Sequence, residues 1–148
     1  MATKSKSPFT LDESAGHLIN HAAWAVRAAF ESQLAHYEVT APQWTVLVRL
    51  WEEDNQAPSE ICRRLFFDRP TMTGIIDRME SRGLVLRKRD DSDRRVIRIT
   101  LTKKGRALEN KLPPVALAVD TQTLKGLNPE EIKVFIRCLK KVVANFTG

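Results

Sequence analysis

Residues 68–101 read DRPTMTGIIDRMESRGLVLRKRDDSDRRVIRITL, and this stretch decides the fold. Asp68 is a favourable N-cap residue, and Pro70 in the first helical turn gives up no needed hydrogen bond. Gly83 stands where a helix needs a left-handed residue just past its end. Between them an apolar stripe recurs at the spacing of a helix that lies on a core: Met72, Ile75, Ile76 and Met79. The stretch therefore begins with a predicted helix over residues 68–82.

Two short strands are expected after this helix. Residues 84–89 (LVLRKR) and 95–101 (RVIRITL) favour strands, and the polar loop 90–94 joins them. The second strand alternates two sets of residues, so one face should be buried and the other wet: Ile97, Ile99 and Leu101 against Val96, Arg98 and Thr100. A helix followed by a hairpin with a basic tip predicts a winged helix-turn-helix, an arrangement that reads DNA.

The positive charge of the chain is concentrated in the same region. Residues 69–106 hold 12 cationic and 5 anionic side chains, a surplus of +7, so the other 110 residues carry −1 of the total +6. Clustered cations beside a helix and a wing are typical of phosphate binding. The alternative is a solvated charged face. Because the cluster coincides with the motif, we expect double-stranded DNA as the partner.

Three segments resemble a known family. PQWTVL (residues 42–47), DRPTMTGIIDRMESRGLVLR (68–87) and DRRVIRITLTKKG (93–105) are similar to the multiple-antibiotic-resistance regulator (MarR) family of bacterial transcription factors. Their order and spacing agree from about Leu18 to the C-terminus, and the Asp-x-Arg wing signature is the most specific part. The resemblance implies a homodimeric DNA-binding regulator, more commonly a repressor, whose operator affinity a small effector lowers.

The resemblance also implies a mainly α fold with a small β-hairpin wing. Residues 40–102 should form the winged helix-turn-helix head, and residues 11–36 and 103–148 a helical dimerisation lobe built from the N- and C-terminal helices. Residues 1–10 are expected to be a disordered basic tail. A dimer of such heads should read an inverted repeat with half-sites about 10 bp apart, or a multiple of that distance.

Helix boundaries follow from capping residues and prolines. We expect one long helix over residues 11–36, a second capped by Thr40 with Gln43, and a third from Pro58. Thr102 should cap a helix that breaks or kinks at residues 113–114, resumes at Val115 and ends near Gly126. The last helix should begin after Asn128 and carry an apolar stripe that needs a partner surface. In the second helix we expect the inner face to comprise Trp44, Leu47, Val48 and Trp51.

The helix over residues 68–82 should enter the major groove. We expect DNA contacts from its outer face, with Arg63 of the preceding helix on the backbone: Arg69, Pro70, Thr71, Thr73, Gly74 and Arg78. The wing loop would place Arg94 or Arg95 in the flanking minor groove. The resemblance implies that Asp93 orients Arg95 and that Asp77 pairs with a wing arginine. An ion pair that only stiffens the hairpin is the alternative.

Gly74 departs from the family pattern, in which many members carry arginine at the middle of this helix. A glycine there costs about 1 kcal/mol in helix propensity, so another effect should offset it. We hypothesise that Gly74 lets the helix backbone approach the groove closely.

Effectors of the resembled family are often small aromatic acids bound between lobe and head. The candidate pocket walls here are His21, Trp24, Trp44 and Trp51, with His17 or Arg27 able to meet a carboxylate. Each also has a packing explanation: Trp44 and Trp51 as core residues, and the two histidines with Trp24 as a half-buried aromatic face. A zinc site on His17 and His21 is a third reading, although no further ligand is evident nearby.

Length and composition exclude several classes. A chain of 148 residues with 43% hydrophobic residues suffices for one domain with a core. It has no apolar run of about 18 residues and no secretory signal pattern, so we expect no membrane span and a cytoplasmic location. Cys62 and Cys138 should stay reduced, in buried structural roles.

The same residues bear on two rival functions. No nucleophile–base arrangement, metal-ligand set or phosphate loop is visible, so we expect neither an enzyme nor a bound cofactor or metal. A winged-helix adaptor that binds protein instead of DNA is the stronger rival, but it leaves the charge on the head and wing unexplained.

Overall fold

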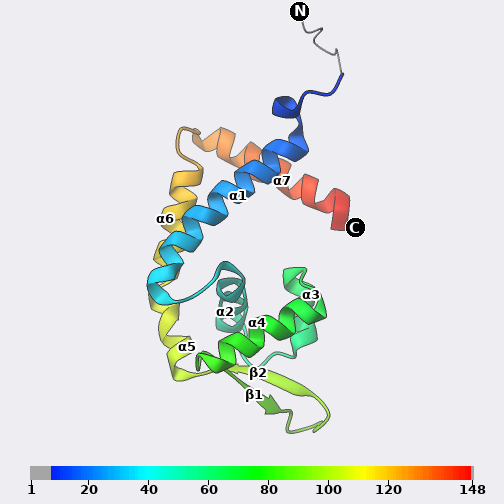
Figure 1. Ribbon diagram of the computed structural model, residues 1–148, viewed down its shortest axis with the longest axis vertical. Coiled ribbons are helices and arrows are strands. Elements are labelled where there is room, and N and C mark those ends of the chain that lie inside the picture. The colour runs from blue at the N-terminus through cyan, green and yellow to red at the C-terminus, as the bar shows by residue number, and fades with distance from the viewer. Residues whose placement is uncertain (1–7, 148) are drawn as a thin grey trace, which may run out of the picture.

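The molecule has a group of three helices with a β-hairpin at one end and a second group of helices at the other (Figure 1). The computed structural model describes residues 8–147. We call residues 41–101 the reading head; it contains α2 (Ala41–Glu52), α3 (Pro58–Leu65), α4 (Arg69–Ser81), β1 (Val85–Arg89) and β2 (Ile97–Leu101). We call α1 (Ala15–Leu34), α6 (Pro113–Thr123) and α7 (Pro129–Thr147) the helical arm, and α5 (Lys103–Ala107) leads from the head to it. The expected mainly α fold with a small hairpin is confirmed.

Helix α4 forms as its sequence predicts. The Asp68 carboxylate accepts a hydrogen bond from the Thr71 backbone N–H at 2.7 Å, which satisfies a donor at the helix start. Gly83 follows the helix with φ of 67°, the left-handed conformation that glycine adopts without strain. The four stripe residues are at most 2% exposed: Met72, Ile75, Ile76 and Met79. This face holds α4 on the core and turns the opposite face outward.

One hydrophobic core lies inside the reading head. Val46, Leu47 and Leu50 of α2 meet Ile61 of α3 and the inner stripe of α4 there. The expected inner face of α2 was therefore partly wrong, because only Leu47 of the four expected residues is fully buried. The other three expected residues lie half-buried to one side of the core: Trp44, Val48 and Trp51.

The hairpin is antiparallel, with Val85 opposite Leu101 and Arg89 opposite Ile97. Ile99 is fully buried at its centre, but the other residues of β2 are half-buried on both faces, so the expected alternation is confirmed only in part. On the other edge of β2, Gln56 exchanges two backbone hydrogen bonds with Ile99, of 3.2 and 2.8 Å. The loop between α2 and α3 thus joins the sheet at a single position and anchors the hairpin to the head.

Several helix ends differ from the sequence expectation. The expected long first helix is divided, because Ser14 caps α1 and a separate 3-10 turn, Leu11–Glu13, precedes it. Helix α6 begins at Pro113 rather than Val115, because its prolines occupy the first turn, where no intrahelical N–H is needed. The Thr40–Gln43 capping box of α2 is confirmed. The tail expected over residues 1–10 lies outside the described residues except for its last three.

The outer faces of the helical arm carry apolar side chains that the chain itself does not cover. Helix α6 packs along α1, whereas α7 has no fully buried residue. Phe146 is 86% exposed, and Phe135, Ile136 and Val143 of the same helix are also exposed. Cys138, expected to be buried, is exposed on α7, whereas Cys62 is half-buried. Among residues 8–147 no helix is long and apolar enough to cross a membrane.

Candidate nucleic-acid interface

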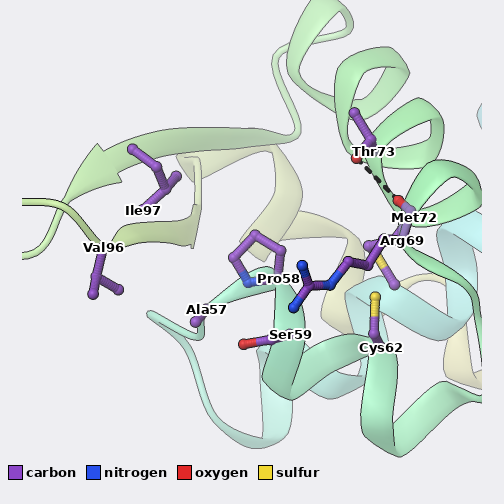
Figure 2. A pocket seen from close by; sticks show the side chains of 9 residues that line it. All are labelled: Ala57, Pro58, Ser59, Cys62, Arg69, Met72, Thr73, Val96 and Ile97. Atoms are coloured by element: carbon purple, nitrogen blue, oxygen red, sulfur yellow. Dashed lines mark hydrogen bonds between the residues drawn. The ribbon is translucent and has the colours of Figure 1, made fainter.

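The outer face of α4 presents cations and small polar side chains to solvent. Arg69, Pro70, Thr71, Thr73 and Arg78 are all exposed there. The Thr73 hydroxyl donates to the Arg69 carbonyl at 3.0 Å (Figure 2), so its hydrogen is engaged within the helix. Thr73 can therefore offer its methyl group or accept a hydrogen bond, but it is less suited to donate to a phosphate. The hydrogen bond from the Thr71 N–H lowers the pKa of Asp68, so this cap stays ionised at neutral pH.

Gly74 lies in the middle of this face and leaves room for the side chain of Arg78. A Cβ atom at residue 74 would meet Arg78 Nη1 at 3.3 Å and Cζ at 3.9 Å. The Arg78 side chain thus lies over the hydrogen atoms of Gly74. The three nearest atoms to that position all belong to the flexible Arg78 guanidinium, so a movement of this one side chain would expose the helix backbone there.

The tip of the wing carries an arginine held by its neighbour. The Asp93 carboxylate accepts three hydrogen bonds from Arg95. The donors are the Arg95 backbone N–H, Nε and Nη2, at 3.1, 3.0 and 3.1 Å. These bonds lower the pKa of Asp93. The Arg95 side chain is nevertheless 90% exposed. Arg89, at the end of β1, donates to the Arg94 carbonyl at 2.8 Å and thereby stabilises the loop. The contact between Asp93 and Arg95 is therefore compatible with an arginine presented to a groove.

The middle of strand β1 is tied to α4 by a second arginine. Arg87 of β1 donates to Asp77 at 2.6 Å and to Glu80 at 2.5 Å. Partial burial disfavours the charged form of Arg87, but the two carboxylates outweigh it and raise its pKa. Asp77 thus pairs with an arginine of a wing strand rather than of the wing loop.

Ion pairs within the chain engage part of the cationic cluster. Four of its 12 cations pair with carboxylates: Arg87, Arg95, Arg98 and Arg106. In the described part of the chain the other eight form no ion pair, and Arg69 and Arg78 of α4 are among them. Arg63 of α3 is also exposed without an ion pair within residues 8–147, whereas Arg64 pairs with Glu53 at 3.4 Å. The cations without acidic partners are those best able to exchange counterions for phosphates.

A hollow of about 310 Å³ lies between α3, α4 and the wing (Figure 2). The Arg69 side chain extends over it from α4, and Ser59 and Cys62 of α3 lie beside it. Burial raises the pKa of the Cys62 thiol, although the charge of Arg69 acts in the opposite direction. The thiol is therefore protonated near neutral pH and a poor nucleophile.

The aromatic residues fall into two separate groups. Trp44 and Trp51, with ring centroids 5.6 Å apart, line a groove of about 440 Å³ between α2 and α6. Two acidic residues also line it: Glu52, whose carboxylate pairs with Arg49, and Glu109. His17, His21, Trp24 and Arg27 do not line this groove.

The second group runs along α1. The rings of His17 and His21 are 6.0 Å apart, and those of His21 and Trp24 are 6.2 Å apart. Trp24 is 67% exposed, so the half-buried aromatic face expected from sequence is not formed within one chain. No group of three potential metal ligands occurs among the described residues, so nothing there supports the zinc reading.

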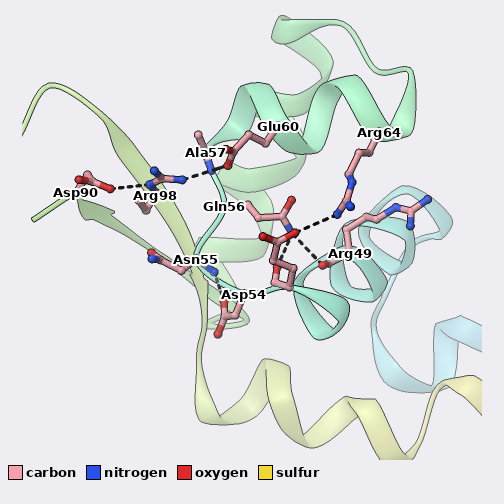
Figure 3. Close-up of polar contacts among 10 residues, drawn as sticks. Arg49, Asp54, Asn55, Gln56, Ala57, Glu60, Arg64, Asp90 and Arg98 are labelled. Atoms are coloured by element: carbon pink, nitrogen blue, oxygen red, sulfur yellow. Dashed lines mark hydrogen bonds and ion pairs between the residues drawn. The ribbon is translucent and has the colours of Figure 1, made fainter. Parts of the chain in front are cut away.

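Sequence reasoning missed the polar residues that connect the wing to the head. Asp54, in the α2–α3 loop, accepts from the Leu101 backbone N–H at 2.9 Å and from Arg106 at 2.7 Å. Arg98, expected on the wet face of β2, instead joins Glu60 to Asp90 (Figure 3). Their only signal in the sequence is a charged residue in a strand or loop, which does not reveal its partner.

Comparisons with known proteins agree with this geometry. The family model described as "MarR family" matches residues 39–97. The transcriptional regulator TtmR of Methylorubrum extorquens is 43% identical over 74% of this chain, which spans 56% of that relative's length. The transcriptional repressor NicR of Pseudomonas putida is 28% identical over 96% of this chain and 90% of its own.

Among solved structures, BpsR of Bordetella bronchiseptica is 31% identical. It superimposes with a TM-score of 0.86 over 93% of this chain and 98% of its own, and its DNA binding is regulated by 6-hydroxynicotinic acid. The family model matches within the head and the two residues before it, whereas the match to BpsR also extends into the helical arm. The chain belongs to the MarR family of winged helix-turn-helix transcriptional regulators.

Proposed function

We propose that this protein is a homodimeric repressor that binds an inverted-repeat operator and releases it when a small aromatic effector binds. The observation that carries the proposal is that the reading head presents two cationic elements, a helix and a wing. Helix α4 presents Arg69 and Arg78 without acidic partners among residues 8–147, and the wing presents Arg95 at its tip. In the proposed mode the helix enters one major groove and the wing enters the minor groove beside it.

The division of labour is proposed along the same lines. The DNA-binding domain, residues 40–102, would contact the operator through Arg69, Pro70, Thr71, Thr73, Gly74 and Arg78, with Arg63 on the backbone and Arg94 or Arg95 in the minor groove. Asp93 would orient Arg95, and Asp77 would hold strand β1 of the wing through Arg87. Residues 11–36 and 103–148 would form the dimerisation lobe.

The uncovered apolar residues of the helical arm support dimerisation. Leu18 and Ile19 of α1 are exposed, as is the α7 stripe that ends at Phe146. Burying one large apolar side chain contributes about 1.5–3 kcal/mol, so a row of them in water favours association. Pairing the arms of two copies would set a fixed distance between two heads, which an inverted repeat requires.

Selection from random duplex DNA tests the DNA-binding part. The wild-type protein should enrich an inverted repeat, and its affinity should fall steeply with salt, by about 0.9 in the log–log slope for each neutralised phosphate. Sedimentation should give a dimer. If no sequence is enriched, the winged-helix adaptor becomes the better account. A monomer at micromolar concentration would contradict the proposed dimer.

The wing is tested by the variant Arg95→Ala. We expect operator affinity to fall by about tenfold or more, because the arginine that would occupy the minor groove is lost, while the dimer persists. The variant Arg49→Ala is a matched control, since it removes an arginine held by Glu52 on α2, away from the wing. An unchanged gel-shift titration of Arg95→Ala would exclude the wing from the mechanism.

The effector part rests on the groove lined by Trp44 and Trp51, which lies where the head meets α6. A ligand that binds the DNA-incompetent shape more tightly lowers operator affinity. Because Glu52 and Glu109 also line the groove, a neutral ring should bind there more tightly than the matching acid. For an acid, His17 and His21 with Trp24, or Arg27, offer the other candidate contacts on α1.

Titration of the protein–operator complex with 6-hydroxynicotinate and with nicotinamide decides between these sites. Two results together would support binding in the groove. Nicotinamide should release the operator and quench tryptophan fluorescence, and the variant Trp44→Phe should show less quenching. Release by the acid alone supports the α1 contacts. Failure of both compounds at millimolar concentration contradicts an effector of this ring size.

A further inference from the structure

The geometry points to Arg98 as a positioning residue that sets the wing against the reading head and thereby brings Arg95 to the operator. This inference rests on the proposed function and adds to it a residue that would not itself touch DNA. Arg98 donates through Nη1 to Glu60 Oε2 at 3.1 Å and through Nε to Asp90 Oδ2 at 2.8 Å (Figure 3). Its side chain is 28% exposed and lies between the two carboxylates.

The head side of this connection is rigid. The same oxygen of Glu60 that accepts from Arg98 also accepts the Ala57 backbone N–H at 2.7 Å. That bond belongs to the start of α3, one of the two helices of the helix-turn-helix. A carboxylate held by a helix terminus and by a guanidinium has little rotamer freedom, so Arg98 is anchored to the head rather than to a mobile side chain.

The wing side of the connection reaches Arg95. Asp90 divides its two oxygens between two tasks: Oδ2 accepts from Arg98, and Oδ1 accepts the backbone N–H groups of Ser92 and Asp93 at 2.8 and 3.0 Å. Asp93 in turn holds Arg95. A continuous series of hydrogen bonds therefore leads from α3 through Arg98 to the tip of the wing, and Arg98 is the one link that joins two elements 38 residues apart.

The consequence is that Arg98 differs from the other wing cations. A hairpin of two short strands can tilt, and Arg87, opposite Ile99 at the middle of the hairpin, holds only strand β1 to α4. Arg98, opposite Lys88, holds strand β2 to α3 and, through Asp90, also holds the start of the loop. Without it, Arg95 would still be present but would sample several positions, and ordering it on DNA would cost conformational entropy.

Two substitutions of Arg98 and one control test this. Arg98→Met removes both ion pairs and keeps an unbranched apolar stem in place of the arginine stem. Arg98→Lys keeps the charge, but one ammonium group cannot span both carboxylates with the same fork geometry. Arg49→Met removes an arginine from a pair with Glu52 on α2, away from the hairpin, and changes the net charge equally.

The first measurement needs no DNA. In Arg98→Met the amide hydrogens of Ser92 and Asp93 should exchange about tenfold faster than in the wild type, while Ile99 keeps its protection as evidence of an intact fold. Arg49→Met should leave all three amides unchanged. Equal protection of Ser92 and Asp93 in Arg98→Met and wild type would overturn the inference, whether or not the protein binds DNA.

The second measurement uses the duplex that the wild-type protein enriches from random DNA. Arg98→Met should bind it about tenfold more weakly, a typical size for one link in a coupled polar network, and Arg98→Lys should recover only part of the loss. In the Arg94→Ala/Arg95→Ala background, Arg98→Met should have no further effect. Full recovery by lysine, or an equal loss in that background, would show that Arg98 acts through its charge alone. A failure to enrich any duplex would refute the proposed function, and the exchange result would still decide whether Arg98 orders the wing.

Discussion

Replacing Gly74 with alanine should stabilise the fold and weaken operator binding at once. The new Cβ would meet Arg78 first, at 3.3 Å from Nη1, which is the flexible end of a long side chain. The packing penalty is therefore small, and alanine is favoured over glycine in a helix interior by about 1 kcal/mol. For a chain of this size that corresponds to a rise in Tm of about 3 °C.

Operator binding should respond in the opposite direction. The added methyl group projects from the outer face of α4 and displaces the Arg78 guanidinium, so it would hold the helix backbone away from the groove. We expect affinity to fall by about fivefold, a loss within the range for one impaired groove contact. Gly16→Ala is the matched control, because its Cβ would meet only Ser14 Oγ at 3.9 Å on α1, far along the chain from the head.

The assays are thermal unfolding followed by circular dichroism and fluorescence anisotropy of a labelled operator, on the same preparations. If Gly74→Ala raises Tm and binds the operator as well as wild type, glycine is not there for close approach. If Tm falls, the outer face of α4 is more tightly packed than its geometry indicates.

Two further outcomes are expected. Gly105→Ala should lower Tm by several degrees in a thermal melt, because its Cβ would lie 2.2 Å from the Leu84 carbonyl oxygen. The overpacking costs about 1–3 kcal/mol, which outweighs the gain in helix propensity. An unchanged or higher Tm would contradict the packing of α5 on the head. The Arg98 hydrogen bond and two loop amides lower the pKa of Asp90 from 3.8 to about 2, so its interactions stabilise the fold above pH 3.8 and are lost as the pH falls through 2. Denaturant titrations between pH 2 and 5 should therefore show a shallower decline for Asp90→Asn than for wild type, and identical declines would rule this contribution out.

Local patterns were sufficient for the elements that contain their own signals. Asp68, the apolar stripe and Gly83 predict the start, buried face and end of α4, because each acts within about one turn of the helix. The Asp93–Arg95 contact likewise joins residues two apart. These features decided the fold class and the family resemblance.

Sequence patterns failed where several faces compete for the same core. Trp44 and Trp51 fit the stripe of α2, but Val46 and Leu50 take the central position, because α3 and α4 approach α2 from that side. The tryptophans were left to form a groove with α6, a helix that begins 62 residues after Trp51. Periodicity gives the width of an apolar face but not which neighbour will cover it.

The sequence by itself determined which helix is the candidate for reading DNA and which residues that helix turns outward, because capping and helical periodicity are local and its own side chains satisfy them. Only the tertiary structure decided which cations remain available for DNA. Arg98 and Arg106 belong to the same basic cluster as Arg69, but they meet Glu60 and Asp54 from segments 38 and 52 residues away. An ion pair forms where folding brings two side chains within about 4 Å, and that distance depends on the packing of whole elements rather than on the spacing of residues along the chain.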